Sequence, residues 1–149
     1  MTYKHIMIAV DGSNTSDLAV HEAIKLTKAL KARLRIIHIV DETIFNYIDE
    51  YVDFDTLWDG YKKVGHDVLN KVSEKVKQAQ IEYETTLIEL KPGKGRIAEK
   101  IVAEAQAWPA DLLIIGSHGR RGFSRLILGS VAENVLRIST MPVLLVRGQ

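Results

Sequence analysis

The sequence predicts an α/β fold in which helices cover both faces of one parallel β-sheet. Short apolar runs alternate along the chain with segments whose apolar residues recur every three to four positions, as in strands joined by amphipathic helices. The runs are continuously apolar, which is typical of strands buried on both faces. Because strands joined by helices run in the same direction, we expect a doubly wound parallel sheet.

The first half of the chain is expected to contain three strands and two helices. The strands are predicted at residues 6–10, 34–40 and 83–90, and the threonines of the third indicate a less buried position. The first helix is expected from about residue 14, because one face would then carry Ala19, Ala23, Leu26 and Leu30. The second helix is expected near 60–80, with an apolar face made of Val64, Val68, Val72 and Val76.

The second half is expected to add two helices and two strands. A third helix is predicted by the spacing of Ile97, Ile101, Ala105 and Trp108, and a buried strand follows at residues 112–115. A fourth helix is expected from Ser130, with an apolar face made of Val131, Val135 and Ile138. The final strand is predicted at residues 143–146. We expect one domain over residues 1–149.

The composition excludes several classes of protein. The 149 residues are 46% hydrophobic and 26% charged, which is ordinary for a globular domain. The chain has no cysteine, which excludes disulfide frameworks, zinc–thiolate sites and thiol chemistry. The net charge of +1 gives no sign of a nucleic-acid partner. The N-terminal apolar run is too short for a signal peptide, and no run reaches the length of a membrane span. We therefore expect a cytoplasmic protein without membrane contact.

One segment, residues 41–60, departs from the alternating pattern. It holds seven acidic residues and no lysine or arginine, and with Tyr61 it holds six of the ten aromatic residues of the chain. It follows the second strand, on the side where ligands bind in such sheets. The favoured interpretation is a loop and an early helical turn whose aromatic rings pack on the body of the protein. The alternative is a lid or a surface for a partner.

Glycines cluster after the fourth strand in a pattern that indicates an anion site. Gly116 ends that strand, Gly119 follows after two residues, and Gly129 and Ser130 follow after nine more, at the expected start of a helix. Glycines let the backbone approach a phosphate closely, and a helix N-terminus offers N–H groups and partial positive charge. Ligands in parallel sheets lie beyond the strand carboxyl ends, so Asp11 and Gly12, after the first strand, are expected beside this loop. The pattern predicts a nucleotide-binding protein.

These residues resemble the ATP-binding signature of the universal stress protein family, G-x2-G-x9-G-(S/T). The resemblance extends to AVDGS at residues 9–13, SHGRRG at residues 117–122 and PVLLVR at residues 142–147. It covers essentially the whole chain apart from residues 41–60.

The resemblance implies an adenine nucleotide alpha hydrolase-like fold with sheet order 3-2-1-4-5 and an ATP site between strands one and four. The residues that it assigns to the site are Ala9, Val10, Asp11, Val40, Ile115, Gly116, Gly119, Arg120, Gly129, Ser130 and Val131. Mg²⁺ is expected to be held mainly through the phosphates. The resemblance also implies a homodimer formed through the edge strand from Val143 to Val146.

Structural explanations compete with these roles. Ser130 and Glu133 have the spacing of a capping box, and Asp11 can cap the first helix or its turn. Arg120, Arg121 and Arg125 can be a solvated loop face as readily as phosphate ligands. Four histidines show no metal-ligand spacing and are interpreted as structural: His5, His21, His38 and His66. His118 is interpreted as a loop residue that bonds to the backbone. Gly93 and Gly95 match a degenerate dinucleotide-binding fingerprint. They follow the third strand and not the first, so we interpret them as part of a tight turn.

No catalytic constellation is recognised, and no residue is assigned a catalytic role. We interpret the site as one that holds ATP, with hydrolysis or autophosphorylation at most slow. Two alternatives remain open at this point: a slow ATPase or autophosphorylating enzyme, and a dimeric scaffold without nucleotide that acts through residues 41–60.

Overall fold

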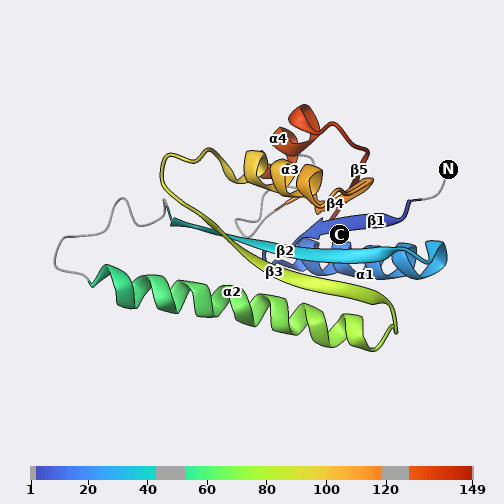
Figure 1. Cartoon of the computed structure of the whole chain (residues 1–149), viewed down its shortest axis with the longest axis horizontal. Coiled ribbons are helices and arrows are strands. Elements are labelled where there is room, and N and C mark those ends of the chain that lie inside the picture. The colour runs from blue at the N-terminus through green and yellow to red at the C-terminus, as the bar shows by residue number, and fades with distance from the viewer. Residues whose placement is uncertain (1–2, 43–52, 119–127, 149) are drawn as a thin grey trace.

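A computed structural model describes residues 3–42, 53–118 and 128–148 of the chain (Figure 1). Its elements alternate strictly between strands and helices. In chain order they are β1 (His5–Ala9), α1 (Asn14–Leu30), β2 (Arg33–Asp41), α2 (Phe54–Lys77), β3 (Glu82–Leu90), α3 (Ile97–Ala107), β4 (Leu112–Gly116), α4 (Ser130–Ile138) and β5 (Val143–Val146).

The five strands form one parallel sheet in the order β3-β2-β1-β4-β5, which confirms the expected fold and strand order. β1 lies in the middle, where Ile8 pairs with Ile36 of β2 and with Ile114 of β4. All three side chains are fully buried. By contrast, β3 lies at one edge, and most of its residues are exposed or half-buried, as its threonines indicated.

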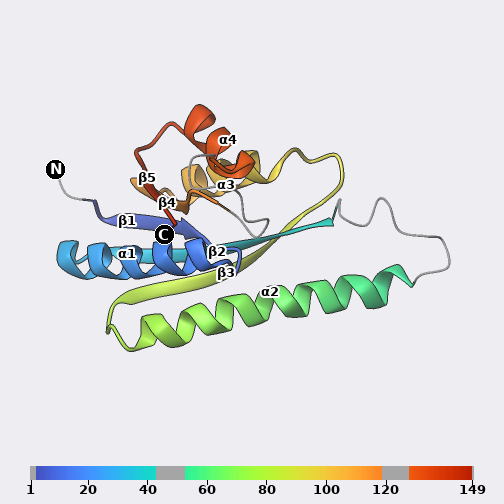
Figure 2. The ribbon, with the colours of Figure 1, turned by 180° about the vertical axis from the view of Figure 1, so that it is seen from behind.

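Two pairs of helices cover the two faces of the sheet. Figures 1 and 2 show α1 and α2 on one face and α3 and α4 on the other. Each face has its own hydrophobic core. The core beneath α1 and α2 includes Ile6, Ile8, Val20, Ile36 and Val76. The core beneath α3 and α4 includes Met7, Ile37, Ile101, Leu113 and Val135. The continuous apolar strands are thus explained by burial on both sides.

The second helix differs from its prediction at both its start and its buried face. α2 begins at Phe54 because Asp53 caps it, accepting hydrogen bonds from the Asp55 N–H (3.1 Å) and the Thr56 hydroxyl (2.7 Å). The Thr56 hydrogen bond holds the pKa of Asp53 below its usual value. Val64 is 46% exposed and does not belong to the buried face. That face consists of Trp58, Gly65, Leu69, Val72 and Val76.

The turn before α3 agrees with its prediction, whereas the buried face of α4 differs from its prediction. The turn between β3 and α3 contains Gly93 (φ 78°) and Gly95 (φ 97°), so its glycines serve a tight turn, as expected. Ile138 is 40% exposed and does not share the buried face of α4, which consists of Ala132 and Val135.

Candidate functional site

The strand ends and helix starts predicted to form the site meet at one edge of the sheet. β1 and β4 are neighbours, and their carboxyl ends reach the same edge. The Gly129 N–H donates to the Ser117 carbonyl oxygen (2.8 Å), which places the start of α4 beside the end of β4. The structure therefore brings Gly116, Gly129 and Ser130 together, whereas Gly119 and Arg120 lie outside the described residues, as do Arg121 and Arg125.

The N-terminus of α4 has no side-chain cap among the residues that the structure describes, because its N-cap residue is a glycine. Gly129 is the N-cap, Ser130 is the first helical residue, and Ser130 makes no capping hydrogen bond. The capping-box interpretation of Ser130 is therefore wrong. The helix begins one residue earlier than the box requires, and Glu133 pairs instead with Arg137 (3.2 Å). The Ser130 side chain is exposed, and the N–H groups of the first turn have no partner within the helix itself.

The turn after β1 is held by several hydrogen bonds. The Asp11 Oδ1 atom accepts from the Ser13 N–H (2.9 Å), so Asp11 caps this turn, while Ser13 is the N-cap of α1. The φ angle of Gly12 is 83°, in the left-handed region that favours glycine. Asp11 is half-buried and lies at the edge toward which the N-terminus of α1 points.

Gly116 is required by packing at the end of β4. A Cβ atom at this position would lie 2.9 Å from Thr15 Cγ2 and 3.4 Å from the Thr15 backbone carbonyl. Thr15 also lies against Gly148, where a Cβ atom would be 2.9 Å from the Thr15 hydroxyl. The absence of a side chain at Gly116 thus allows α1 to pack closely against the end of β4. A ligand is not needed to explain this glycine.

The remaining predicted site residues lie around the same edge but differ in what they can offer. Ala9 and Val131 are half-buried, and Ile115 is 6% exposed. Val40 lies three residues beyond Ile37, the partner of Ala9, and has no exposed surface. Its Cγ1 atom would lie 3.0 Å from a Cβ atom at Gly65 of α2. The side chain of Val40 therefore packs against α2, and Val40 lies behind the surface of this edge.

A family model described as the universal stress protein family matches residues 2–147. The chain belongs to this family. A universal stress protein of Methanocaldococcus jannaschii is 32% identical over 97% of this chain and 82% of that protein. A family member from Burkholderia pseudomallei has a solved structure with a TM-score of 0.79 and 26% identity, covering 98% of this chain and 97% of that one. A universal stress protein solved in complex with cAMP has a TM-score of 0.72 and 25% identity, covering 99% and 98%.

In this family member, the segment of residues 41–60, which is rich in acidic and aromatic residues, divides into two parts. Residues 43–52 lie outside the described residues, and residues 54–60 form the first turns of α2. Trp58 is 7% exposed and stacks on Phe54 with ring centroids 6.4 Å apart. The ammonium groups of Lys62 and Lys91 each lie 5.7 Å from the centre of the Trp58 ring. For Trp58, packing on the body of the protein is confirmed.

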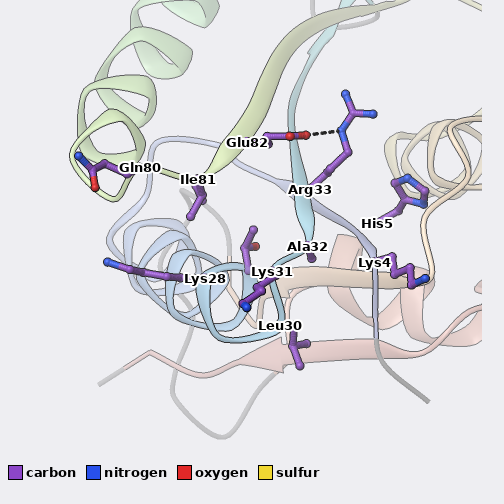
Figure 3. A pocket seen from close by; sticks show the side chains of 11 residues that line it. Lys4, His5, Lys28, Leu30, Lys31, Ala32, Arg33, Gln80, Ile81 and Glu82 are labelled. Atoms are coloured by element: carbon purple, nitrogen blue, oxygen red, sulfur yellow. Dashed lines mark ion pairs between the residues drawn. The ribbon is translucent and has the colours of Figure 1, made fainter.

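An open hollow lies at the opposite end of the sheet from the candidate site, beside the N-terminal ends of β1, β2 and β3 (Figure 3). Its basic residues include Lys4, Lys28, Lys31 and Arg33. Figure 3 shows Lys28 and Lys4 pointing to opposite sides, and Arg33 pairs with Glu82 (3.1 Å). These cations do not converge on one point, so the hollow does not resemble a phosphate site.

The described residues show no sign of a metal site or of a membrane-spanning helix. Within residues 3–42, 53–118 and 128–148, no three histidine or acidic side chains gather as metal ligands would. None of the helices described there is long and apolar enough to cross a bilayer.

Proposed function

We propose that this universal stress protein binds ATP at the edge where β1, β4 and α4 meet, as a cytoplasmic regulatory or stress-protection module. The observation that carries the proposal is the N-terminus of α4, which begins at Gly129 without a side-chain cap and lies beside the end of β4. An uncapped helix N-terminus attracts phosphate through its N–H groups and its dipole. The structural neighbour in complex with cAMP supports an adenine nucleotide as the ligand.

The proposed roles follow from these positions. Ser130 and Val131 hold the phosphates through their backbone N–H groups and the Ser130 hydroxyl, and Gly129, whose N–H is bonded to Ser117, lets the phosphates approach closely. Ala9, Val10, Asp11 and Ile115 form the floor beside the nucleoside, and Val40 lies behind the adenine side. Gly116, Gly119 and Arg120 complete the site on the loop side, by the family signature. Mg²⁺, where present, is held mainly by the phosphates, since Mg²⁺ commonly keeps few protein ligands.

Calorimetry on protein stripped of nucleotide tests this proposal. We expect ATP to bind with a dissociation constant in the micromolar range, which corresponds to about 8 kcal/mol. Thermal unfolding with excess ATP and Mg²⁺ should show a matching rise in Tm. If neither heat nor a Tm shift is observed, ATP binding is refuted and the scaffold alternative gains support.

Replacing Ser130 with alanine separates binding from helix stability. Because Ser130 is exposed and does not cap α4, Ser130→Ala should change the free energy of unfolding by less than about 0.5 kcal/mol. Loss of a hydroxyl that donates to a charged phosphate should weaken ATP binding roughly tenfold. Urea denaturation and calorimetry measure the two effects, and Ser130→Thr is the control that keeps the hydroxyl. An unchanged ATP affinity would remove Ser130 from the site.

We also propose that two copies associate through β5. This strand lies at the edge of the sheet, and the carbonyls of Pro142 and Val146 accept from β4, so the outward N–H groups belong to Val143 and Leu145. Leu144 is 37% exposed on this strand. An unprotected apolar edge is prone to pairing, and twofold pairing is its simplest form.

Leu144→Glu is expected to convert the dimer into a monomer, because it places two like charges near the twofold axis. Light scattering at tens of micromolar protein measures the change. Val64→Glu is the matched control, since Val64 is a similarly exposed apolar residue on α2, far from β5 in the sheet order. A wild-type protein that is already monomeric at this concentration contradicts the dimer proposal.

A further inference from the structure

The peptide bond between Val10 and Asp11 is held at both of its polar ends by side chains from other elements. The His38 Nδ1 atom of β2 lies 2.7 Å from the Val10 carbonyl oxygen. The Asp11 N–H donates to the Ser16 hydroxyl oxygen of α1 (3.2 Å). The carbonyl and the N–H belong to one peptide group, so its plane is fixed between β2 and α1.

Both side chains are buried, which makes the arrangement rigid. His38 is 7% exposed and Ser16 is 4% exposed. Because a carbonyl oxygen only accepts, His38 Nδ1 must carry the proton and donate it, which fixes the role of this nitrogen. The Val10 N–H donates to the Ile37 carbonyl oxygen (2.9 Å), so the residue before Asp11 is bonded through both its N–H and its carbonyl.

The α2 helix presses the His38 ring into this position. A Cβ atom at Gly65 would lie 3.0 Å from His38 Cδ2, so the α2 backbone at Gly65 packs directly against the His38 ring. The ring is thus packed from one side and bonded to Val10 on the other. The orientation of the Val10–Asp11 peptide depends on side chains of β2 and α1, neither of which the sequence motif includes.

We propose that His38 and Ser16 are positioning residues for the nucleotide site: together they clamp the Val10–Asp11 peptide and so fix the direction of the Asp11 carboxylate. The inference rests on the proposed function, because it assigns the clamp a role in nucleotide affinity. A site whose backbone is already ordered loses less conformational freedom on binding, so the clamp increases affinity by preorganisation. The carboxylate is itself fixed further by the Ser13 N–H.

His38→Leu removes the donor, and His38→Asn retains an amide N–H near the position of Nδ1. We expect His38→Leu to raise the dissociation constant for ATP at least tenfold and His38→Asn to remain within about threefold of wild type. His21→Leu, at an exposed position of α1, is the control and should bind as wild type. Calorimetry gives the affinities, and urea denaturation shows that the variants compared are folded. Ser16→Ala, which removes the other half of the clamp, replaces His38→Leu if that variant does not fold.

A second measurement is independent of nucleotide. Hydrogen exchange of the Asp11 amide, followed by NMR on nucleotide-free protein, should be faster in His38→Leu and Ser16→Ala than in wild type. Unchanged exchange of the Asp11 amide, or wild-type ATP affinity in His38→Leu, overturns the clamp. Failure of wild-type protein to bind ATP contradicts the proposed function instead, so the two failures are distinguishable.

Discussion

Gly116→Val is expected to lower ATP affinity at least tenfold and to reduce the free energy of unfolding by about 1–3 kcal/mol. The valine Cβ would lie 2.9 Å from Thr15 Cγ2, so Thr15 must shift and the first turn of α1 is expected to move away from β4. That movement displaces Ser16 and the Asp11 turn, which we propose to face the nucleotide. Calorimetry and urea denaturation measure the two losses.

Thr15→Ser provides the matched control for this prediction. It removes Cγ2 but keeps the hydroxyl. The double variant Thr15→Ser/Gly116→Val should therefore recover part of the free energy of unfolding that Gly116→Val loses. A double-mutant cycle should give a coupling energy of roughly 0.5–3 kcal/mol between the two positions. If the two substitutions are simply additive, the contact with Thr15 is not the reason that residue 116 is glycine.

Gly65→Leu is expected to destabilise the protein by about 1–3 kcal/mol and to weaken ATP binding. A Cβ atom there would lie 2.8 Å from Leu87 Cδ1 and 3.0 Å from both His38 and Val40. The leucine must therefore push α2 off the sheet at the two β2 residues that we connect with the site. Thermal unfolding should show a Tm lowered by roughly 2–4 °C per kcal/mol for a chain of about this size.

Gly60→Leu is the matched control on the same helix. No atom lies within 4 Å of a Cβ atom built at Gly60, and replacing glycine in a helix stabilises it by roughly 0.5–1 kcal/mol. We therefore expect the free energy of unfolding to rise in Gly60→Leu and to fall in Gly65→Leu. A stabilising effect at both would show that α2 can move without cost to the sheet.

The fold could be predicted because its strands carry an unambiguous signal. The run from Ile6 to Ile8 is buried on both faces, so continuous apolar character and central position have the same cause. The start of α2 could not be predicted from apolar spacing, because it is set by Asp53 and Thr56. The prediction that Val64 belongs to the buried face is wrong, because the helix approaches the sheet at Gly65. A glycine adds nothing to the apolar pattern from which the buried face is predicted.

The site could be predicted only in part, for similar physical reasons. The spacing of Gly116, Gly129 and Ser130 located the sheet edge correctly, but it did not show that Gly116 is needed for Thr15. The spacing of Ser130 to Glu133 fits a capping box as well as a phosphate contact, whereas in the structure the neighbouring Gly129 is the N-cap. His38 was interpreted as structural, since its hydrogen bond to Val10 joins residues 28 positions apart. Only the register of β1 and β2 reveals such a contact.

Chemical-shift mapping by NMR on nucleotide-stripped protein is the most direct test of the claim that ATP binds where β1, β4 and α4 meet. We expect titration with ATP to shift the backbone amides of residues 10–13, 116–118 and 129–131 most strongly. The amides around Lys28, Lys31 and Gln80, which line the hollow at the opposite end of the sheet, should stay in place. Shifts concentrated at that hollow, or no shifts at saturating ATP, would contradict the account.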